Sequence, residues 1–315
     1  MLMNTEATMN FIAVDIGASR MRVALYPDLG LDEVQLKVIP TLGEGSTLER
    51  LVGLIASVWP EGREVNAIGL AVAGLVDPAS GMIRHVVNIA NWDGLPIGEL
   101  LSARFQVPVR IGNDANLAAL GEYHYGAGRG HDNLLYLTIS TGIGAGVIVN
   151  GRLLTGERGL AGEIGHITVE PNGPLCSCGQ RGHLEAICSG PAIVRFVLEG
   201  IQTGRDSLLT GAEPGLDASR VAEAARQGDD LCVEAFREAG NVLGRTLADL
   251  LHVFDPGAII LGGGVVQAGN LLLEPLERSL HANVLSEAYL NGLLVTTAQL
   301  GDSSGLVGAL ALARS

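Results

Sequence analysis

Short apolar runs alternate with stretches of helical spacing along the first half of the chain, which is the pattern of an α/β protein. Strands are predicted at residues 11–17, 21–26, 34–39, 67–72 and 107–111. Helices are predicted at 46–59, 97–105 and 115–125, with Ser46 or Thr47 as the N-cap of the first. The run at 67–72 is apolar throughout, which favours a strand buried on both faces.

The same pattern begins again near residue 130, with a strand at 134–140, a turn at Thr141-Gly-Ile-Gly144 and a returning strand at 145–149. Asp15-Ile-Gly17 and Ser140-Thr-Gly142 occupy equivalent places in two strand–turn–strand units. Either unit alone could be an ordinary hairpin. Together they predict a duplicated α/β core, in which two related lobes face each other across a cleft.

The remaining pattern predicts how the lobes divide the chain. Helices are expected at 191–199, 218–227, 230–254 and 303–313, and strands at 258–261 and 293–297. The last helix is expected to return to the first lobe. We therefore predict a smaller lobe of residues 1–113 plus 302–315 and a larger lobe of residues 114–301, with hinges near 113–130 and 300.

Composition and charge then exclude several classes of protein. The 315 residues are 47% hydrophobic, which excludes a disordered chain, and at about 150 residues per domain the length suggests two domains. A net charge of −14 argues against a general nucleic-acid or membrane surface. No apolar stretch reaches the roughly 20 residues that cross a bilayer. We expect no signal peptide and, with four cysteines, no disulfide framework. A cytoplasmic enzyme fits these limits.

The two turns at the cleft have the chemistry of a phosphate site. Their small residues let backbone N–H groups approach a polyphosphate, and Ser19, Ser140 or Thr141 can add hydroxyl hydrogen bonds. Neither turn is a P-loop, and no G-x-G-x-x-G follows the first strand. Asp15 would repel a phosphate unless a divalent cation lay between them, and Mg²⁺ suits that position. The pattern therefore favours a Mg·ATP site.

Gly112-Asn-Asp-Ala-Asn116 joins a strand to a helix, so Asn113 or Asp114 could be the helix N-cap. A carboxylate at the mouth of a strand beside a phosphate cleft could also be the general base for a hydroxyl nucleophile. These residues alone leave the two roles open.

A glycine-rich segment at 151–190 contains a candidate metal site. Cys176 and Cys178 are two residues apart, His166 precedes the first by ten residues, and His183 follows the second by five. Tetrahedral Zn²⁺ accepts two cysteines and two histidines, although reduced thiols beside unrelated histidines would show the same spacing. A closed site would be structural and would hold Glu163, His166 and Glu185 rigidly enough to bind sugar hydroxyls. Cys188 and Cys232 lie in helical patterns and are expected to be buried.

These motifs resemble those of the ROK family of sugar kinases and sugar-responsive repressors, from about residue 11 to the last helix. The resemblance rests on the stretches Ile139–Val147, Ala161–His166, Cys176–Glu185, Asp15-Ile-Gly17 and Gly112–Asn116, with Gly74–Asp77 and Asn88–Trp92 similar to sugar-site segments. It implies a two-lobed actin-like ATPase fold of the ribonuclease H type. It also implies a homodimer or homotetramer.

The resemblance assigns a role to each matching residue. Asp114 would be the base that takes a proton from the sugar hydroxyl. The sugar would be bound by Gly74, Asn88, Asn113, Asp114, Glu163, His166 and Glu185. Mg·ATP would be bound by Asp15, Gly17, Ser19, Arg20, Thr141, Gly142, Gly263 and Gly264. Structural zinc would be held by His166, Cys176, Cys178 and His183.

Two positions depart from the family pattern. His183 replaces the usual third cysteine, so we expect a Cys₂His₂ site. Ala18-Ser-Arg20 replaces a more usual Gly-Gly-Thr-Lys-like run, in which Ser19 keeps a hydroxyl and Arg20 a positive charge. We expect ATP binding to persist, with Ala18 tightening the turn if a positive φ is needed there.

The leading functional prediction is an ATP-dependent hexose kinase that phosphorylates glucose at C6. The alternatives are a kinase for N-acetylmannosamine or N-acetylglucosamine, and a catalytically silent sugar-binding protein. Polyphosphate also remains open as the donor. A family repressor would carry a helix-turn-helix ahead of the sugar domain, and the first strand near residue 11 predicts none. The expected partner is a hexose, with no nucleic acid or membrane.

Overall fold

Two five-stranded sheets form the framework of the protein. The computed structural model describes residues 9–27, 30–86, 89–211 and 213–315. The first sheet contains β1 (Asn10–Ile16), β2 (Arg20–Pro27), β3 (Gln35–Pro40), β4 (Ala67–Val72) and β7 (Val109–Asn113). The second contains β8 (Leu134–Ile139), β9 (Ile143–Val149), β10 (Arg152–Leu153), β11 (Ala258–Gly262) and β12 (Leu294–Thr297). A separate hairpin pairs β5 (Leu75–Asp77) with β6 (Met82–His85).

The two sheets have the same topology. Their strand orders are β3-β2-β1-β4-β7 and β10-β9-β8-β11-β12. In each order the first two pairings are antiparallel and the last two are parallel. The predicted duplication is therefore confirmed at the level of strand order, with the β1–β2 hairpin equivalent to the β8–β9 hairpin.

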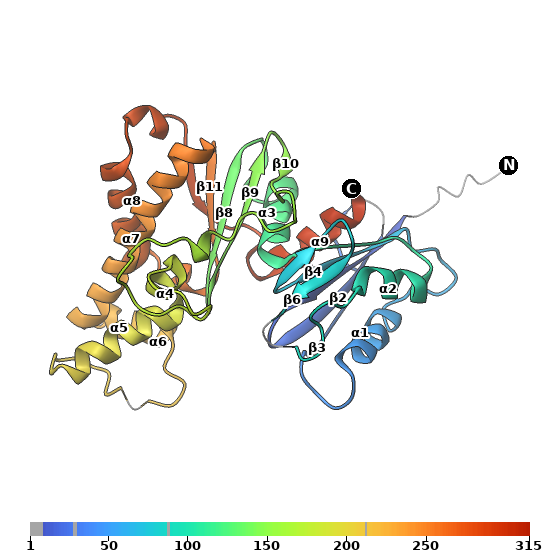
Figure 1. The fold of residues 1–315 in the computed structure, drawn as a ribbon, viewed down its shortest axis with the longest axis horizontal. Coiled ribbons are helices and arrows are strands. Elements are labelled where there is room, and N and C mark those ends of the chain that lie inside the picture. Colours follow the sequence, from blue (N-terminus) through green and yellow to red (C-terminus); the bar gives the residue numbers. More distant parts are fainter. Residues whose placement is uncertain (1–8, 28–29, 87–88, 212) are drawn as a thin grey trace.

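Helices cover both faces of each sheet (Figure 1). The α-helices are α1 (Thr47–Ala56), α2 (Ile97–Phe105), α3 (Asp114–Tyr125), α4 (Leu184–Cys188), α5 (Gly190–Gln202), α6 (Ala218–Arg226), α7 (Asp230–Phe254), α8 (Asn270–Asn283) and α9 (Ser304–Arg314). Short 3₁₀ helices are η1 (Ile164–His166), η2 (Gly264–Ala268), η3 (Glu287–Leu290) and η4 (Gly301–Ser303). No helix in the described part of the chain is long and apolar enough to cross a membrane.

Each sheet has an apolar core on both faces. On the first sheet, α1 and α2 cover the face that contains Ile12, Val14 and Ile68, and α9 covers the opposite face. On the second sheet, helices from α4 to α8 cover one face, and α3 covers the other. The helix α3 follows β7 of the first sheet and packs against the second sheet, whereas α9 follows β12 of the second sheet and packs against the first. In Figure 1 these two helices lie where the two halves of the molecule meet.

Most of the predicted elements are confirmed, with ends that differ by a few residues. Ser46 is the N-cap of α1, where its hydroxyl accepts from Glu49 N. The last helix does pack on the first sheet. Cys188 and Cys232 are fully buried, as expected. The sequence pattern did not indicate the β5–β6 hairpin or α4, because both are too short to show a periodic pattern.

Candidate functional site

A cleft of about 690 Å³ lies between the two sheets. Both hairpin turns, the start of α3 and the glycines after β11 contribute to its wall. The predicted site residues that line it are Asp15, Gly17, Arg20, Asp114, Thr141, Gly142, Glu185, Gly263 and Gly264. The duplicated turns thus bring together residues that are far apart in the sequence.

Asn113 and Asp114 have different roles at the start of α3. Asn113 is the N-cap, because its Oδ1 accepts hydrogen bonds from Ala115 N (3.0 Å) and Asn116 N (3.1 Å). Its Nδ2 donates to the Gly74 carbonyl at 3.1 Å, which ties the helix start to the turn between β4 and β5. Asp114, half-buried, faces the cleft and accepts one hydrogen bond from Ala115 N. The capping role belongs to Asn113, which leaves Asp114 available for chemistry.

The environment of Asp114 disfavours its charged form. Burial raises the pKa of this carboxyl group to about 6, and the negative charges of Asp15 and Glu163 act in the same direction. Hydrogen bonds from backbone N–H groups oppose the rise. A carboxylate with such a pKa is ionised at neutral pH and is a stronger base than an ordinary aspartate.

The turns are shaped for close approach of a ligand to the backbone. Gly263 has a φ of 92°, and a Cβ there would lie 2.2 Å from the Ile139 carbonyl oxygen, so only glycine fits. A Cβ at Gly142 would lie 2.5 Å from Glu185 Oε2. Ala18 is not among the described residues with positive φ. The condition under which Ala18 would tighten the first turn is therefore not met, because the backbone at this residue is not left-handed.

Ion pairs that the sequence did not indicate join β2 to the wall of the cleft. Arg22 donates from Nε to Asp15 Oδ2 at 3.0 Å, and its Nη1 is 3.2 Å from Asp302 Oδ2. Arg20 Nη2 is 2.6 Å from Asp302 Oδ1. A charged residue on an alternating strand is usually a solvated one, so the sequence held no signal for Arg22.

A second cavity of about 440 Å³ adjoins the cleft and shares Ser140, Thr141 and Gly264 with it. Its other walls come mainly from α5 and the start of α6, with apolar contributions from Pro191, Val194, Leu198, Leu216 and Val265. The sequence did not predict this cavity, because helical apolar residues are more often core residues than ligand contacts. Its apolar lining beside the phosphate turns suits a flat aromatic base.

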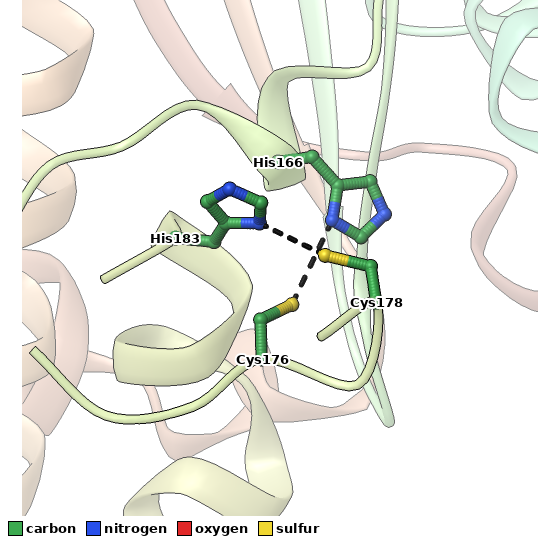
Figure 2. A group of neighbouring side chains, drawn as sticks. All are labelled: His166, Cys176, Cys178 and His183. Atoms are coloured by element: carbon green, nitrogen blue, oxygen red, sulfur yellow. Dashed lines mark hydrogen bonds between the residues drawn. The ribbon is translucent and has the colours of Figure 1, made fainter. Parts of the chain in front are cut away.

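The candidate metal ligands converge at one point (Figure 2). The ligand atoms of His166, Cys176, Cys178 and His183 all lie within 4.8 Å of one another. His166 Nδ1 is 3.7 Å from Cys176 Sγ, and His183 Nδ1 is 3.3 Å from Cys178 Sγ. Bond lengths of about 2.0–2.3 Å in a tetrahedron would separate neighbouring ligand atoms by about 3.5 Å. The four side chains therefore fit a Zn²⁺ ion.

Glu185 connects the metal cluster to the cleft. The residue lies at the start of α4, two positions after His183. Its Oε1 accepts from Ser177 Oγ at 2.9 Å, and its Oε2 accepts from Ile143 N at 3.2 Å, at the start of β9. Ser177 lies between the two cysteines, so the loop that carries the thiols also orients a carboxylate that lines the cleft.

The remaining predicted sugar residues lie beyond the lining of the cleft. Glu163 directly precedes η1, and His166 ends it. Burial raises the pKa of Glu163; the His166 charge opposes this rise and the Glu185 charge adds to it, so the three side chains interact. Gly74 is linked to Asn113, as described above. Ser19, which was predicted to bind Mg·ATP, is exposed and does not line the cleft. Asn88 lies outside the described residues.

Comparisons with known proteins give matches along almost the whole chain. The sequence pattern of the ROK family matches residues 11–315. A glucokinase from Thermotoga maritima is 36% identical, over 96% of this chain and 97% of its own. The N-acetylglucosamine repressor of Escherichia coli O157:H7 is 34% identical over 86% of this chain, but only 66% of its own length is matched.

Solved structures show the same fold. The ROK family glucokinase from Streptomyces griseus, solved in complex with glucose and AMPPNP, superposes with a TM-score of 0.81. It is 37% identical, and the match covers 97% of this chain and 99% of that one. That relative therefore binds a sugar and an ATP analogue on a fold shared over almost the full length of both chains.

Proposed function

Because this chain belongs to the ROK family, we propose that it is an ATP-dependent glucose kinase with the two-lobed actin-like fold. It transfers the γ-phosphoryl group of ATP to the C6 hydroxyl of glucose. The observation that carries the proposal is the position of Asp114, a carboxylate of raised pKa in a cleft between two glycine-containing turns. Support also comes from the glucose and AMPPNP complex of the Streptomyces griseus relative.

Asp114 is the general base. Its carboxylate accepts the proton of the attacking hydroxyl as the oxygen–phosphorus bond forms. Asn113 positions this carboxylate by capping α3 and by bonding to the Gly74 carbonyl. Desolvation at the cleft wall strengthens the base without preventing its ionisation at neutral pH.

The donor lies along the turns of the cleft, with its adenine in the apolar cavity beside α5. Thr141, Gly142, Gly263 and Gly264 approach its phosphates. Arg22 donates both of its hydrogen bonds with Asp15 to the same carboxylate oxygen, Oδ2. The other carboxylate oxygen of Asp15, Oδ1, can therefore accept a hydrogen bond from a water molecule of a hydrated Mg²⁺. Bound Mg²⁺ would neutralise phosphate charge and orient the transferring group.

The acceptor is held by side chains grouped around the zinc loop. Glu163, His166 and Glu185 supply hydrogen bonds to sugar hydroxyls, together with Asn113 and Asn88. His166 is also one of the four candidate metal ligands, and Glu185 accepts a hydrogen bond from Ser177, which lies between the two cysteines. A Cys₂His₂ zinc ion would be structural, because four protein ligands leave no position for a reacting water. Its role is to fix the side chains that bind the sugar.

Closure of the two lobes completes the site. We infer that residues 1–113 with 302–315 move relative to residues 114–301, since the segments that connect the sheets run through α3 and the stretch before α9. Closure would exclude water, which otherwise competes as phosphoryl acceptor. The proposal includes assembly as a homodimer or homotetramer, which light scattering of the purified protein measures directly.

The test is ADP formation from Mg·ATP with glucose, mannose, fructose, N-acetylmannosamine and N-acetylglucosamine as separate acceptors. We expect saturable turnover with glucose. Asp114→Asn should lower kcat by roughly a thousandfold, in the range of lost general-base catalysis, while calorimetry shows glucose binding retained. Turnover with polyphosphate in place of ATP would revise the donor.

Three results would contradict the proposal. Turnover only with an N-acetylated sugar would replace glucose by an N-acetylhexosamine as the acceptor. N-acetylglucosamine is the sugar for which the Escherichia coli repressor relative is named. Sugar binding without turnover for any acceptor or donor would indicate a silent sugar-binding protein. Equal loss of glucose affinity and kcat in Asp114→Asn would show that Asp114 positions the sugar and is not its base.

A further inference from the structure

Two segments of the chain connect the sheets, and one buried carboxylate contacts both of them. The first connection is α3 with the turn that leads to β8, and the second is the stretch between β12 and α9. Glu122 of α3 has no exposed surface, and its Oε2 accepts from Ala127 N at 2.8 Å and from Gln299 N at 3.2 Å. Its Oε1 accepts from Leu300 N at 2.8 Å and from Ser304 Oγ at 3.2 Å. The carboxylate therefore ties the two connections to each other.

The chemistry of these contacts requires a carboxylate. A buried carboxylate is costly unless its oxygens accept hydrogen bonds, and each oxygen of Glu122 accepts from at least one backbone N–H. Glutamine has the same shape, but its amide nitrogen only donates. In either orientation of the amide, that nitrogen would face a backbone N–H. Glutamine would thus fill the same space and still break the tie between the connections.

The tie also joins two walls of the cleft. Asp114 begins the helix that carries Glu122, about 12 Å away along the helix axis. Residues of the segment 301–305 line the cleft beyond the second connection. A Cβ at Gly305 would lie 3.5 Å from the carboxylate of Asp15, so this segment ends beside the first turn. Glu122 therefore fixes Asp114 relative to the wall beside Asp15.

We propose that Glu122 is a positioning residue for phosphoryl transfer, and that its carboxylate is the pivot about which the two lobes close. The inference rests on the proposed function, because closure around a sugar and a nucleotide is the motion that the pivot guides. With both connections held by one carboxylate, the two sides of the cleft move together. Each ligand then favours the closed state that the other ligand binds, so that their affinities are coupled.

Calorimetry measures this coupling without any turnover. In the wild-type protein, saturating Mg·AMPPNP should lower the Kd for glucose roughly tenfold, which is within the usual range for two coupled sites. In Glu122→Gln the same factor should fall below about twofold, because the two connections no longer move together. The Kd for glucose alone should stay unchanged, since the substitution alters no side chain that is assigned to the sugar.

Gly126→Ala is a second variant, which displaces the carboxylate and keeps its charge. A Cβ at Gly126 would lie 2.0 Å from Glu122 Oε2, and the φ of −116° at this residue is open to alanine. The coupling factor should fall as it does in Glu122→Gln. If Glu122→Gln does not fold, Gly126→Ala carries the test.

Asp229 provides a matched control. It is also buried, and its two carboxylate oxygens likewise accept from backbone N–H groups, those of Leu208 at 2.7 Å and Cys232 at 3.0 Å. These residues belong to neither connection between the sheets. Asp229→Asn should lower Tm, as Glu122→Gln does, and should keep the wild-type coupling factor. The comparison separates the pivot from a general loss of stability.

Hydrogen exchange tests the pivot without a ligand. Peptides that cover residues 126–131 and 297–303 should both exchange faster in Glu122→Gln and in Gly126→Ala, and at the wild-type rate in Asp229→Asn. Unchanged exchange in the first two variants would overturn the pivot. So would a wild-type protein that binds both ligands without coupling, a wild-type coupling factor in Gly126→Ala, or its loss in Asp229→Asn. If the peptides behave as expected while glucose does not bind, the pivot stands and the proposed acceptor fails.

Discussion

Asn113 and Asp114 are neighbours of similar shape, and the sequence could not separate their roles. Asparagine and aspartate are both good N-caps, so local propensity left either residue as the cap and either as the functional group. The structure separates them by position, since Asn113 Oδ1 bonds the first turn of α3 and Asp114 lines the cleft. The position of a cleft depends on the whole fold, which no local pattern contains.

The raised pKa of Asp114 makes a prediction about stability. The carboxyl group titrates near its ordinary value in the unfolded chain but at about 6 in the folded protein. The folded state therefore binds the proton more tightly, and stability falls as pH rises from about 4 to 6. The charged form should cost up to about 3 kcal/mol above that range. Asp114→Asn should raise Tm at pH 7.5, with the difference shrinking towards pH 4.

Asp93 is the control for this titration, because folding shifts its pKa in the opposite direction. Hydrogen bonds from the His85 side chain and from Val86 N lower the pKa of Asp93. Its charged form is favoured by folding, so Asp93→Asn should lower Tm at pH 7.5. A fall in Tm for both variants would show that Asp114 is a stabilising carboxylate, contrary to its assigned environment.

The same pKa predicts the pH dependence of turnover. A general base must be unprotonated, so kcat/KM for glucose should fall below pH 6 and level off above pH 7. Asp15→Asn removes one of the charges that raise this pKa, so the falling limb should move to lower pH. A profile that is flat between pH 5 and 8 would contradict the assignment of Asp114 as the base.

At the scale of elements, the segment that contains the candidate metal ligands, residues 166–185, had a predictable chemistry and an unpredictable conformation. Cysteine and histidine spacing indicated four ligands, and the structure brings all four together. The short helix α4 and the contact between Ser177 and Glu185 had no signal, because glycine-rich backbone can follow many paths. The path is fixed by tertiary contacts, such as the Gly182 carbonyl that accepts from Val169 N at 2.8 Å.

The loop makes a prediction that joins metal, stability and sugar binding. His183→Ala should abolish stoichiometric zinc, lower Tm and weaken glucose binding together, because Glu185 begins the helix that follows His183. His183→Cys should keep zinc, since it substitutes one competent ligand for another. Metal analysis of each purified variant, with calorimetry for glucose, measures the three effects.

The buried thiol of Cys232 provides the control for this experiment. It lies on α7, away from the cluster, so Cys232→Ala should keep its zinc. A His183→Ala protein that loses zinc and still binds glucose with unchanged affinity would disprove the coupling between the metal and the sugar site.

At the scale of the molecule, two similar hairpins in the sequence indicated the duplicated strand order. Of the two helices that pack on the opposite sheet, only one was predicted to do so. The sequence predicted that the last helix returns to the first sheet, and α9 does so. It held no sign that α3 would leave the first sheet to pack on β8 and β9. Apolar residues on a helix show that a face is buried and do not show which sheet covers it.

The crossing of α3 and α9 depends on close contact between two backbones. A Cβ at Gly308 of α9 would lie 1.7 Å from the Leu117 carbonyl oxygen, and one at Gly121 of α3 would lie 2.8 Å from the Ser304 oxygen. Any side chain at Gly308 must push the helices apart, and with them the two sheets that they cover. Small residues at this crossing therefore set the distance between the lobes.

Gly308→Ala should destabilise the protein by about 1–3 kcal/mol, which is the usual effect of overpacking. The same substitution should raise the KM for glucose, because the cleft can no longer close to the same width. Gly53 is the matched control, since it is also a helical glycine but a Cβ there would meet nothing within 4 Å. Gly53→Ala should stabilise by up to about 1 kcal/mol through helix propensity and leave KM unchanged. Urea unfolding and steady-state kinetics of both variants measure these effects. Equal stability changes in the two variants would show that the α3–α9 crossing tolerates separation, and that the spacing of the lobes is set elsewhere.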